Sequence, residues 1–280
     1  MARWRKLGII AGGGALPVRI AAACAAQGAD HYIVRLLGAA DPSLRDSPGD
    51  DCAIGEAGKI IRLLKQENCD AAVFAGIVQR PDFSSLKADW RGAALLPKII
   101  AAAARGDGAI LSVLVETLES EGLIVIGVEE AVQELTARAG AFGAYTPSDV
   151  NFGDMRKAAE IVHALGPFDV GQGAVVAKGL VLAIEAAEGT DAMLDRCGTL
   201  PNGIAQGGVL VKRPKPGQEL RIDLPVIGTE TVRRAARAGL AGVAVEAGVA
   251  LIIDADEVAA LADEKGLFVY GFTAQEVAPR

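Results

Sequence analysis

Residues 212–223 carry a local group of charges that suits diphosphate chemistry, although the whole chain has a net charge of −7. Four cations precede Asp223; they are Lys212, Arg213, Lys215 and Arg221. Such cations complement phosphate oxygens, and a carboxylate can bind a metal or orient a water molecule. We therefore predict substrate contacts from Lys212, Lys215 and Arg221, and a catalytic or metal-binding role for Asp223. A solvated loop is the alternative.

A second group combines acids with a Gly-Thr pair at the start of an expected helix. Gly189 and Thr190 offer an N–H and a hydroxyl to a phosphate. The carboxylates of Glu185 and Asp191 are oxygen ligands that suit Mg²⁺. The alternative is that the acids Glu188 and Asp191 only favour the first turn of the helix.

The glycines Gly12, Gly13 and Gly14 stand between an expected strand and an expected helix. Such a turn is a ready anion site, because backbone N–H groups point at the ligand and the helix dipole favours negative charge. The spacing matches neither the dinucleotide-binding G-x-G-x-x-G nor a P-loop. A tight turn without a ligand is equally compatible with the pattern.

A fourth segment, residues 79–90, follows another expected strand. It contains the cations Arg80 and Lys87, which could hold a phosphate or a carboxylate, together with Phe83 and Trp90. Ligands of open α/β folds bind near the carboxyl ends of the strands. We predict substrate contacts from Arg80 and Lys87; a solvated loop anchored by its aromatic residues is the alternative.

The elements that would position these groups alternate between strands and helices, which predicts an α/β protein. The expected strands are 7–11, 32–36, 71–75, 123–127, 174–177, 180–184, 209–212, 242–246, 250–253 and 267–271. The expected helices are 15–27, 56–67, 95–104, 109–120, 153–165, 190–196, 229–238 and 257–265. We predict a Rossmann-like parallel-sheet domain over 1–130, a linker over 131–150, and a mixed α/β domain over 151–280 that carries most of the catalytic site.

Composition narrows the class of protein. The 280 residues are 51% hydrophobic and 22% charged, which excludes disorder as the main state. The net negative charge argues against a nucleic-acid partner bound through overall charge. No apolar run approaches the ~20 residues of a membrane span. The four cysteines form no C-x-x-C pair and are expected to be buried thiols in a reducing compartment. We expect a soluble, cytoplasmic protein.

Several motifs in this order resemble one family, the UDP-2,3-diacylglucosamine pyrophosphatases of the LpxI type. The likeness covers nearly the whole chain and rests on residues 8–17, 80–90, 106–122, 169–176, 185–193, 212–228 and 238–248. One departure is that Gly127 and Val128 precede Glu129 where the family usually has a His before the Glu.

The resemblance implies a two-domain enzyme of lipid A biosynthesis that binds its substrate between the domains. It would hydrolyse UDP-2,3-diacylglucosamine to 2,3-diacylglucosamine 1-phosphate (lipid X) and UMP, with Mg²⁺ and with water directed at the phosphorus on the sugar side. The essential acid of the family matches Asp223, and the residue types independently suggest Glu185 and Asp191 as further oxygen ligands of the metal. The diacylated substrate implies transient contact with the inner-membrane surface; a homodimer is left open.

Two other functions stay open at this point. The strand–glycine–helix start suggests an NAD(P)- or nucleotide-binding oxidoreductase, but Arg35 stands where an acid for the ribose is expected. A non-catalytic lipid- or nucleotide-binding protein would use the same cations without turnover.

Overall fold

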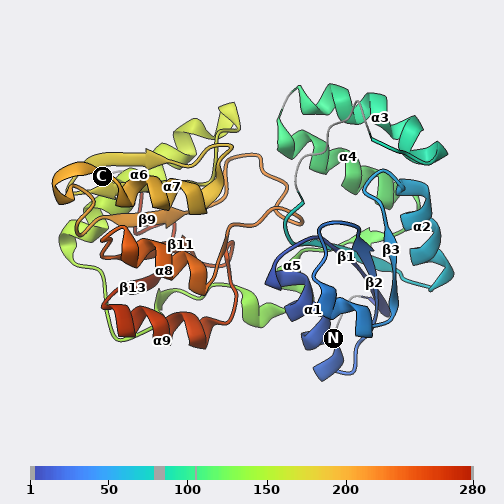
Figure 1. Cartoon of the computed structure of the whole chain (residues 1–280), viewed down its shortest axis with the longest axis horizontal. Coiled ribbons are helices and arrows are strands. Elements are labelled where there is room, and N and C mark those ends of the chain that lie inside the picture. Colours follow the sequence, from blue (N-terminus) through green and yellow to red (C-terminus); the bar gives the residue numbers. More distant parts are fainter. Residues whose placement is uncertain (1–3, 79–85, 105, 279–280) are drawn as a thin grey trace. The chain divides into compact units, whose positions relative to one another are not determined.

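The computed structural model describes residues 4–78, 86–104 and 106–278, apart from the side chains of residues 107 and 202 (Figure 1). Its internal contacts divide the chain into two compact units. Unit 1 consists of Met1–Gln133 with Arg221–Asp223, and unit 2 of Glu134–Leu220 with Leu224–Arg280. Both units are α/β, which confirms the predicted fold class.

Unit 1 is built on a parallel sheet with the order β3-β2-β1-β4-β5. The strands are β1 (Lys6–Ala11), β2 (Asp30–Leu36), β3 (Gly49–Cys52), β4 (Ala71–Ala75) and β5 (Ile124–Val125). The central strand β1 is buried over its last five residues, as expected of a parallel strand covered on both faces. The strand order changes direction between β1 and β4, and ligands of open α/β sheets bind beside such a point.

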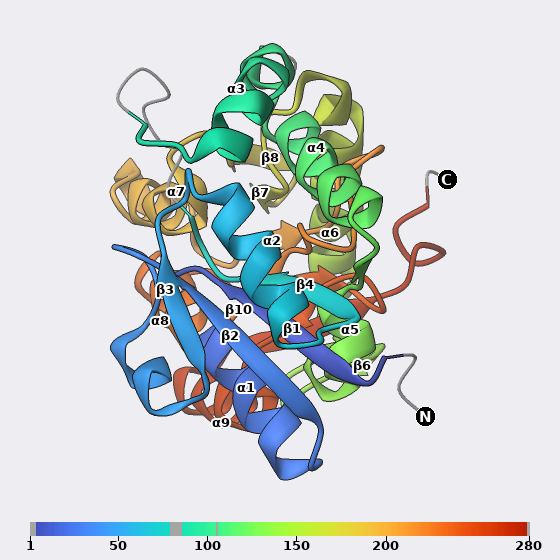
Figure 2. The same cartoon turned by 90° about the vertical axis from the view of Figure 1, so that its right-hand side faces the viewer.

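Helices cover both faces of this sheet. One face packs against α2 (Ala57–Gln66) and α4 (Asp107–Ser120), and Figure 2 shows α1 (Ala15–Ala26) on the opposite side from α2. The short helix α5 (Val128–Ala131) contacts α1, and α3 (Trp90–Ala103) packs on α2 and α4.

Unit 2 contains a mixed sheet with the order β6-β13-β11-β9-β7-β8. Its strands are β6 (Gly140–Ala141), β7 (Gly173–Ala177), β8 (Leu180–Ile184), β9 (Val209–Lys212), β11 (Gly242–Glu246) and β13 (Phe268–Phe272). Strands β9, β11 and β13 are parallel, whereas β6, β7 and β8 pair antiparallel with their neighbours. A separate parallel pair joins β10 (Val226–Ile227) and β12 (Leu251–Ile252).

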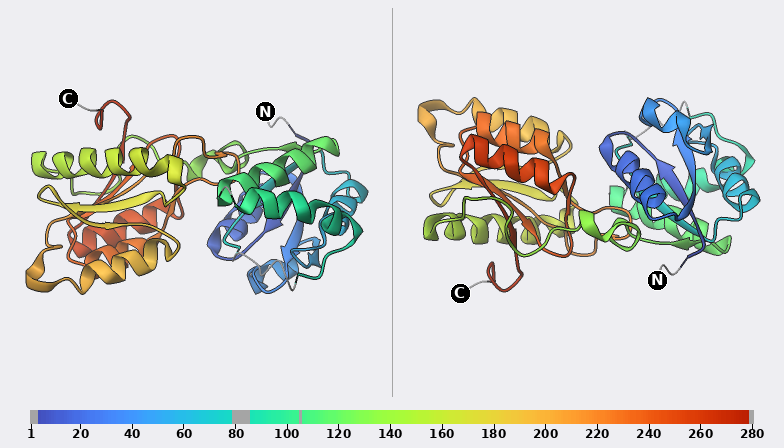
Figure 3. Two further views of the ribbon diagram at one scale, coloured as in Figure 1. Left: turned by 90° about the horizontal axis from the view of Figure 1, so that it is seen from above. Right: turned by 90° about the horizontal axis from the view of Figure 1, so that it is seen from below.

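The helices of unit 2 form two layers around its larger sheet. Helix α6 (Asp149–Leu165) packs on one face, and α7 (Gly189–Gly198), α8 (Thr229–Arg237) and α9 (Ala255–Lys265) cover the other (Figure 3). A capping box between Ser148 and Asn151 begins α6. The short 3₁₀ helices in the described part of the chain are Pro42–Asp46, Gln133–Leu135, Gly166–Phe168 and Pro201–Gly203.

The strands predicted at residues 174–177 and 180–184 pair as an antiparallel hairpin, β7–β8, and a buried carboxylate secures their turn. Lys178 and Gly179 both have positive φ, and their amides donate to Asp154 at 2.8 and 2.7 Å. Asp154 is 2% exposed, so these bonds satisfy a charge that would otherwise be costly to bury.

Most of the segment expected as a linker is assigned to unit 2. Strand β6 lies in this segment and pairs with β13, and Ala137 N donates to Ala250 O at 2.8 Å. The structure also adds β3, which was not predicted from the sequence. Within residues 4–78, 86–104 and 106–278, none of the helices combines the length and the apolar character of a membrane span.

Candidate active site

A trio of polar side chains, of which Lys212 and Glu185 are buried and Thr190 is half-buried, lies at the carboxyl end of β9 in unit 2. Lys212 is the last residue of β9, Glu185 directly follows β8, and Thr190 lies in the first turn of α7. Lys212 Nζ donates to Thr190 Oγ1 at 2.6 Å, and Thr190 Oγ1 donates to Glu185 Oε1 at 2.7 Å. Three residues predicted from two separate sequence motifs therefore form one hydrogen-bonded chain, which we call the buried trio.

The strand order explains how the trio meets. Gly173 on β7 lies between the other two strands: Lys212 pairs with it on one side, and Glu185 N donates to Gly173 O at 2.8 Å on the other. A Cβ at residue 173 would lie 2.5 Å from Glu185 Oε2. Glycine at this position therefore leaves the space in which the two side chains approach one another.

Burial makes the charges of the trio interdependent. The side chains of Lys212 and Glu185 are 6% and 10% exposed, and Nζ lies 3.8 Å from Oε1. An isolated buried charge is strongly unfavourable, so each group stabilises the other. The second carboxylate oxygen, Oε2, is buried without a hydrogen-bond partner among the described residues.

A second polar network adjoins the same end of the sheet. Lys215 forms an ion pair with Asp169, and Lys215 N donates to Gln218 Oε1 at 2.8 Å. Gln218 Nε2 in turn donates to Gln172 Oε1 at 3.1 Å. The site prediction named Lys215 alone, although the motif around residues 169–176 was the signal that could have added Asp169 and Gln172.

The remaining predicted residues of this region have other partners. Asp191 is 56% exposed at its side chain and lies 3.4 Å from Arg234 Nε. Gly189 N donates to Ala186 O at 3.0 Å. Among the described residues, no three acidic, histidine or cysteine side chains group closely enough to hold a metal ion. Glu185 and Asp191, as placed here, do not fit a shared Mg²⁺.

The glycine turn of unit 1 is closed by the neighbouring strand. Gly12 N donates to Ala75 O and Gly13 N to Ile77 O, both at 2.8 Å, and Ile77 N returns a bond to Gly13 O at 2.9 Å. A Cβ at Gly12 would lie 2.7 Å from Ile77 O. Gly14 has a φ of 84° and precedes α1. Any phosphate contact through the backbone here would fall to Gly14 and the first turn of α1.

The predicted catalytic carboxylate, Asp223, and the nearby cation Arg221 lie in unit 1. Arg221 Nη1 donates to Glu119 Oε1 at 2.6 Å, and Ile222 packs against the core beneath α2 and α4. Asp223 completes this three-residue segment and is half-buried. Lys87 is exposed, and Arg80 lies outside the described residues.

Glu129, at the position where the sequence departs from the family pattern, folds back on its own turn. Its carboxylate would lie 2.2 Å from a Cβ at Gly127, so glycine makes this conformation accessible. Burial raises the pKa of Glu129 above the usual carboxyl range.

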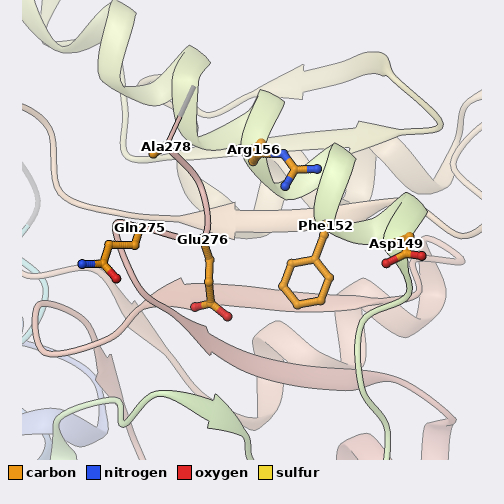
Figure 4. Close-up of a pocket in the computed structure, with 6 residues that line it drawn as sticks. All are labelled: Asp149, Phe152, Arg156, Gln275, Glu276 and Ala278. Atoms are coloured by element: carbon orange, nitrogen blue, oxygen red, sulfur yellow. The ribbon is translucent and has the colours of Figure 1, made fainter. Parts of the chain in front are cut away.

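A separate hollow of about 780 Å³ lies beside α6 (Figure 4). It is lined by Asp149, Phe152, Arg156, Gln275, Glu276 and Ala278, none of which belongs to the predicted site. The Glu276 carboxylate already accepts hydrogen bonds from Tyr270 and Thr273. We therefore place the candidate site at the buried trio and its neighbouring network.

Comparison with known proteins decides the family. The model of the LpxI N-terminal domain matches residues 6–135, and that of the LpxI C-terminal domain matches residues 138–270. This chain belongs to the LpxI family. A relative from Caulobacter vibrioides, named UDP-2,3-diacylglucosamine pyrophosphatase LpxI, is 50% identical over 277 residues, which cover 97% of this chain and 99% of the relative. The LpxI resemblance found in the sequence motifs is thus confirmed.

Proposed function

We propose that this protein hydrolyses the phosphoric anhydride of UDP-2,3-diacylglucosamine to 2,3-diacylglucosamine 1-phosphate (lipid X) and UMP, in lipid A biosynthesis. The observation that carries the proposal is the 50% identity, over 97% of the chain, to a relative named for this activity. The buried Lys212 supports it, since a fixed ammonium can stabilise the charge that develops on phosphate oxygens during cleavage.

Each residue predicted from the sequence has a task in the proposed reaction. Lys212, Lys215 and Arg221 bind diphosphate oxygens, and Asp223 accepts a proton from the attacking water. The water oxygen bonds to the phosphorus on the sugar side while the bond from that phosphorus to the bridging oxygen breaks, so UMP leaves with the bridging oxygen. Reaction in ¹⁸O-water should therefore place the label in lipid X, and label in UMP would contradict the direction of attack.

Dependence on Mg²⁺ stays a prediction from the family resemblance. A bound Mg²⁺ would offset charge on the anhydride oxygens. Because Glu185 and Asp191 have different partners, no step is assigned to the ion. Removal of metal with EDTA should abolish UMP release, and added Mg²⁺ should restore it; undiminished activity in EDTA would refute the dependence.

The deciding experiment incubates the pure protein with UDP-2,3-diacylglucosamine and Mg²⁺ and measures UMP. The wild type should release UMP, and Asp223→Asn should lower kcat by at least about 10³-fold, the order found when a catalytic base is removed. Asp46→Asn, which changes an exposed acid of unit 1, is the matched control and should behave as the wild type. A wild type without UMP release would overturn the proposal.

The same assay separates the two alternative functions. A binding protein would bind the nucleotide lipid without turnover. An NAD(P)-dependent oxidoreductase needs a free group for the ribose at the end of β2, yet Arg35 there bonds to Asp51 at 2.7 Å and to Gly49 O at 2.6 Å. Those contacts give Arg35 a structural role and favour the hydrolase.

The acylated substrate also implies transient contact with the inner-membrane surface. The protein should sediment with lipid vesicles that carry UDP-2,3-diacylglucosamine more than with vesicles that lack it. Equal sedimentation in both cases would contradict this part of the proposal.

A further inference from the structure

The geometry points to Glu185 as a positioning residue for Lys212, in place of the metal-ligand role that its sequence motif suggests. Through Thr190, Glu185 holds the Lys212 ammonium so that its remaining N–H groups face a phosphate oxygen. The inference rests on the proposed function only in taking the ligand to be a nucleoside diphosphate or its phosphate products.

The direction of the hydrogen bonds supports this role. An ammonium can only donate, so Lys212 donates to Thr190 Oγ1. The single hydroxyl proton of Thr190 then goes to Glu185 Oε1, which is 2.7 Å away. The chain Lys212–Thr190–Glu185 therefore has one arrangement of protons, which fixes the rotation of the threonine hydroxyl and the direction of the lysine side chain.

The charges argue against a cation at Glu185. An ammonium already lies 3.8 Å from Oε1, within a pair whose side chains are at most 10% exposed. At low dielectric, a divalent ion on the same carboxylate would meet strong repulsion from Lys212. Asp191, the other predicted ligand, instead pairs with Arg234 at a site where its side chain is 56% exposed.

The carboxylate is also held against the sheet. Glu185 Oε2 occupies the space above Gly173, where a Cβ would lie only 2.5 Å away. A side chain packed in this way has little freedom to turn toward a ligand. Lys212 has N–H groups left to donate to a ligand. An ammonium has three donors, and Thr190 is the one hydrogen-bond partner of Lys212 among the described residues.

Two substitutions interrupt the hydrogen bonds between Lys212, Thr190 and Glu185 at different points. Glu185→Gln keeps the shape of the side chain but removes its charge, and Thr190→Val removes the hydroxyl with little change in volume. Both should lower kcat/KM by about 10- to 100-fold, the range expected for a lost hydrogen bond to a charged group. Thr190→Ser restores the hydroxyl and should restore activity to near the wild-type value.

The matched control is Glu188→Gln, the same chemical change three residues along the chain. Glu188 pairs with Arg196 at 2.9 Å, where the side chains are 35% and 50% exposed. This variant should keep wild-type kinetics. Thermal unfolding of every variant identifies loss of folding, and if Glu185→Gln does not fold, the Thr190→Val and Thr190→Ser pair carries the test.

Binding without metal separates positioning from metal ligation. In EDTA, calorimetry with UMP and with lipid X should show about tenfold weaker binding of at least one product to Glu185→Gln and Thr190→Val. The Mg²⁺ concentration that gives half-maximal activity should stay at the wild-type value in both variants. A positioning residue predicts this combination, because the defect lies in the ammonium and not in the ion.

Three results would overturn the inference. One is a tenfold or greater rise in half-activating Mg²⁺ for both Glu185→Gln and Asp191→Asn, with product binding in EDTA unchanged. Another is wild-type behaviour of Glu185→Gln in kinetics and binding. The third is a Thr190→Ser variant as defective as Thr190→Val. If the wild type itself lacks hydrolysis, the proposed function fails, while product binding in EDTA still decides the role of Glu185.

Discussion

The glycine turn of unit 1 and the buried trio of unit 2 both follow the carboxyl end of a strand, but their hydrogen-bond donors have different partners. In unit 1, the amides of Gly12 and Gly13 donate to carbonyls at the end of β4 and just beyond it. In unit 2, Lys212 donates to Thr190 alone among the described residues. Similar sequence signals for anion binding thus lead to a packed turn in one unit and to a buried, available ammonium in the other.

The largest expected effect comes from removing that ammonium. Lys212→Met should lower kcat/KM by about 10²- to 10³-fold, as when one donor to a developing charge is lost. It should also destabilise the protein by about 3–5 kcal/mol, because Glu185 is left buried without its partner. Kinetics and denaturant unfolding measure the two effects.

A double variant separates stability from chemistry in this region. Lys212→Met combined with Glu185→Gln removes both charges and should recover part of the lost stability without recovering activity. Recovery of activity together with stability would show that Lys212 has no role beyond folding, and the contrast between the two units would then disappear.

The next effect tests the packed turn of unit 1. Gly12→Ala places a Cβ 2.7 Å from Ile77 O and 2.9 Å from Val78 Cγ2, so it should destabilise the protein by about 1–3 kcal/mol, as overpacking does. Gly14→Ala meets no atom within 4 Å, but a φ of 84° with a ψ of 179° is accessible essentially to glycine only, so it should cost about 1–3 kcal/mol through backbone strain. A Gly12→Ala variant as stable as the wild type in denaturant unfolding would contradict the packing role of Gly12.

A smaller effect concerns α3, which begins at a carboxylate and not at a glycine turn. Asp89 accepts hydrogen bonds from Gly92 N at 2.7 Å and from Lys59 N at 2.8 Å. Burial alone would raise the pKa of Asp89, but these and other backbone hydrogen bonds outweigh it and lower the pKa. Asp89→Ala should lose about 1 kcal/mol of stability at pH 7.

The pH dependence of that loss follows from the direction of the shift. The contribution of Asp89 is complete above the ordinary carboxyl pKa and disappears as the pH falls through the lowered value. The difference in unfolding free energy between wild type and Asp89→Ala should therefore shrink on acidification. A difference that stays constant from pH 7 to the acid transition would contradict this assignment.

The smallest effect compares the thiols of the two units. Cys24, Cys52 and Cys69 of unit 1 and Cys197 of unit 2 are all buried and free. Burial raises the pKa of Cys52 and of Cys69 to about 11, so little thiolate exists at neutral pH. A thiol reagent at pH 8 should label all four slowly in the folded protein and rapidly in denaturant; fast labelling of one unit would show that it opens more readily.

The sequence predicted the buried strands well because their signal is local. The apolar runs at residues 71–75, 209–212 and 242–246 match β4, β9 and β11 without change of bounds. Strand β3 was not predicted because its sequence has neither an apolar run nor an alternation of apolar and polar residues. Cys52 is the one buried residue in it. Strand β6 escaped because it has only two residues and depends on β13 for its pairing.

The site residues were predictable by type but not by partner. Glu185, Thr190 and Lys212 were each named from the sequence, yet their mutual contact depends on the order β8-β7-β9 and on a glycine in the middle strand. Spacing along the chain contains neither fact. The Gly12 and Gly13 amides likewise donate to carbonyls at the end of β4 and just beyond it, more than 60 residues away in sequence.

Unit 1 includes the distant segment Arg221–Asp223, so no single cut of the polypeptide separates the two units. A fragment that stops at residue 133 would lack Arg221, the partner of Glu119, and would lack the proposed catalytic carboxylate as well. The complementary fragment would keep Ile222 without the core against which it packs. Expressing the two fragments separately would therefore give two incomplete folds. In co-expression, the C-terminal fragment would have to supply residues 221–223 to unit 1.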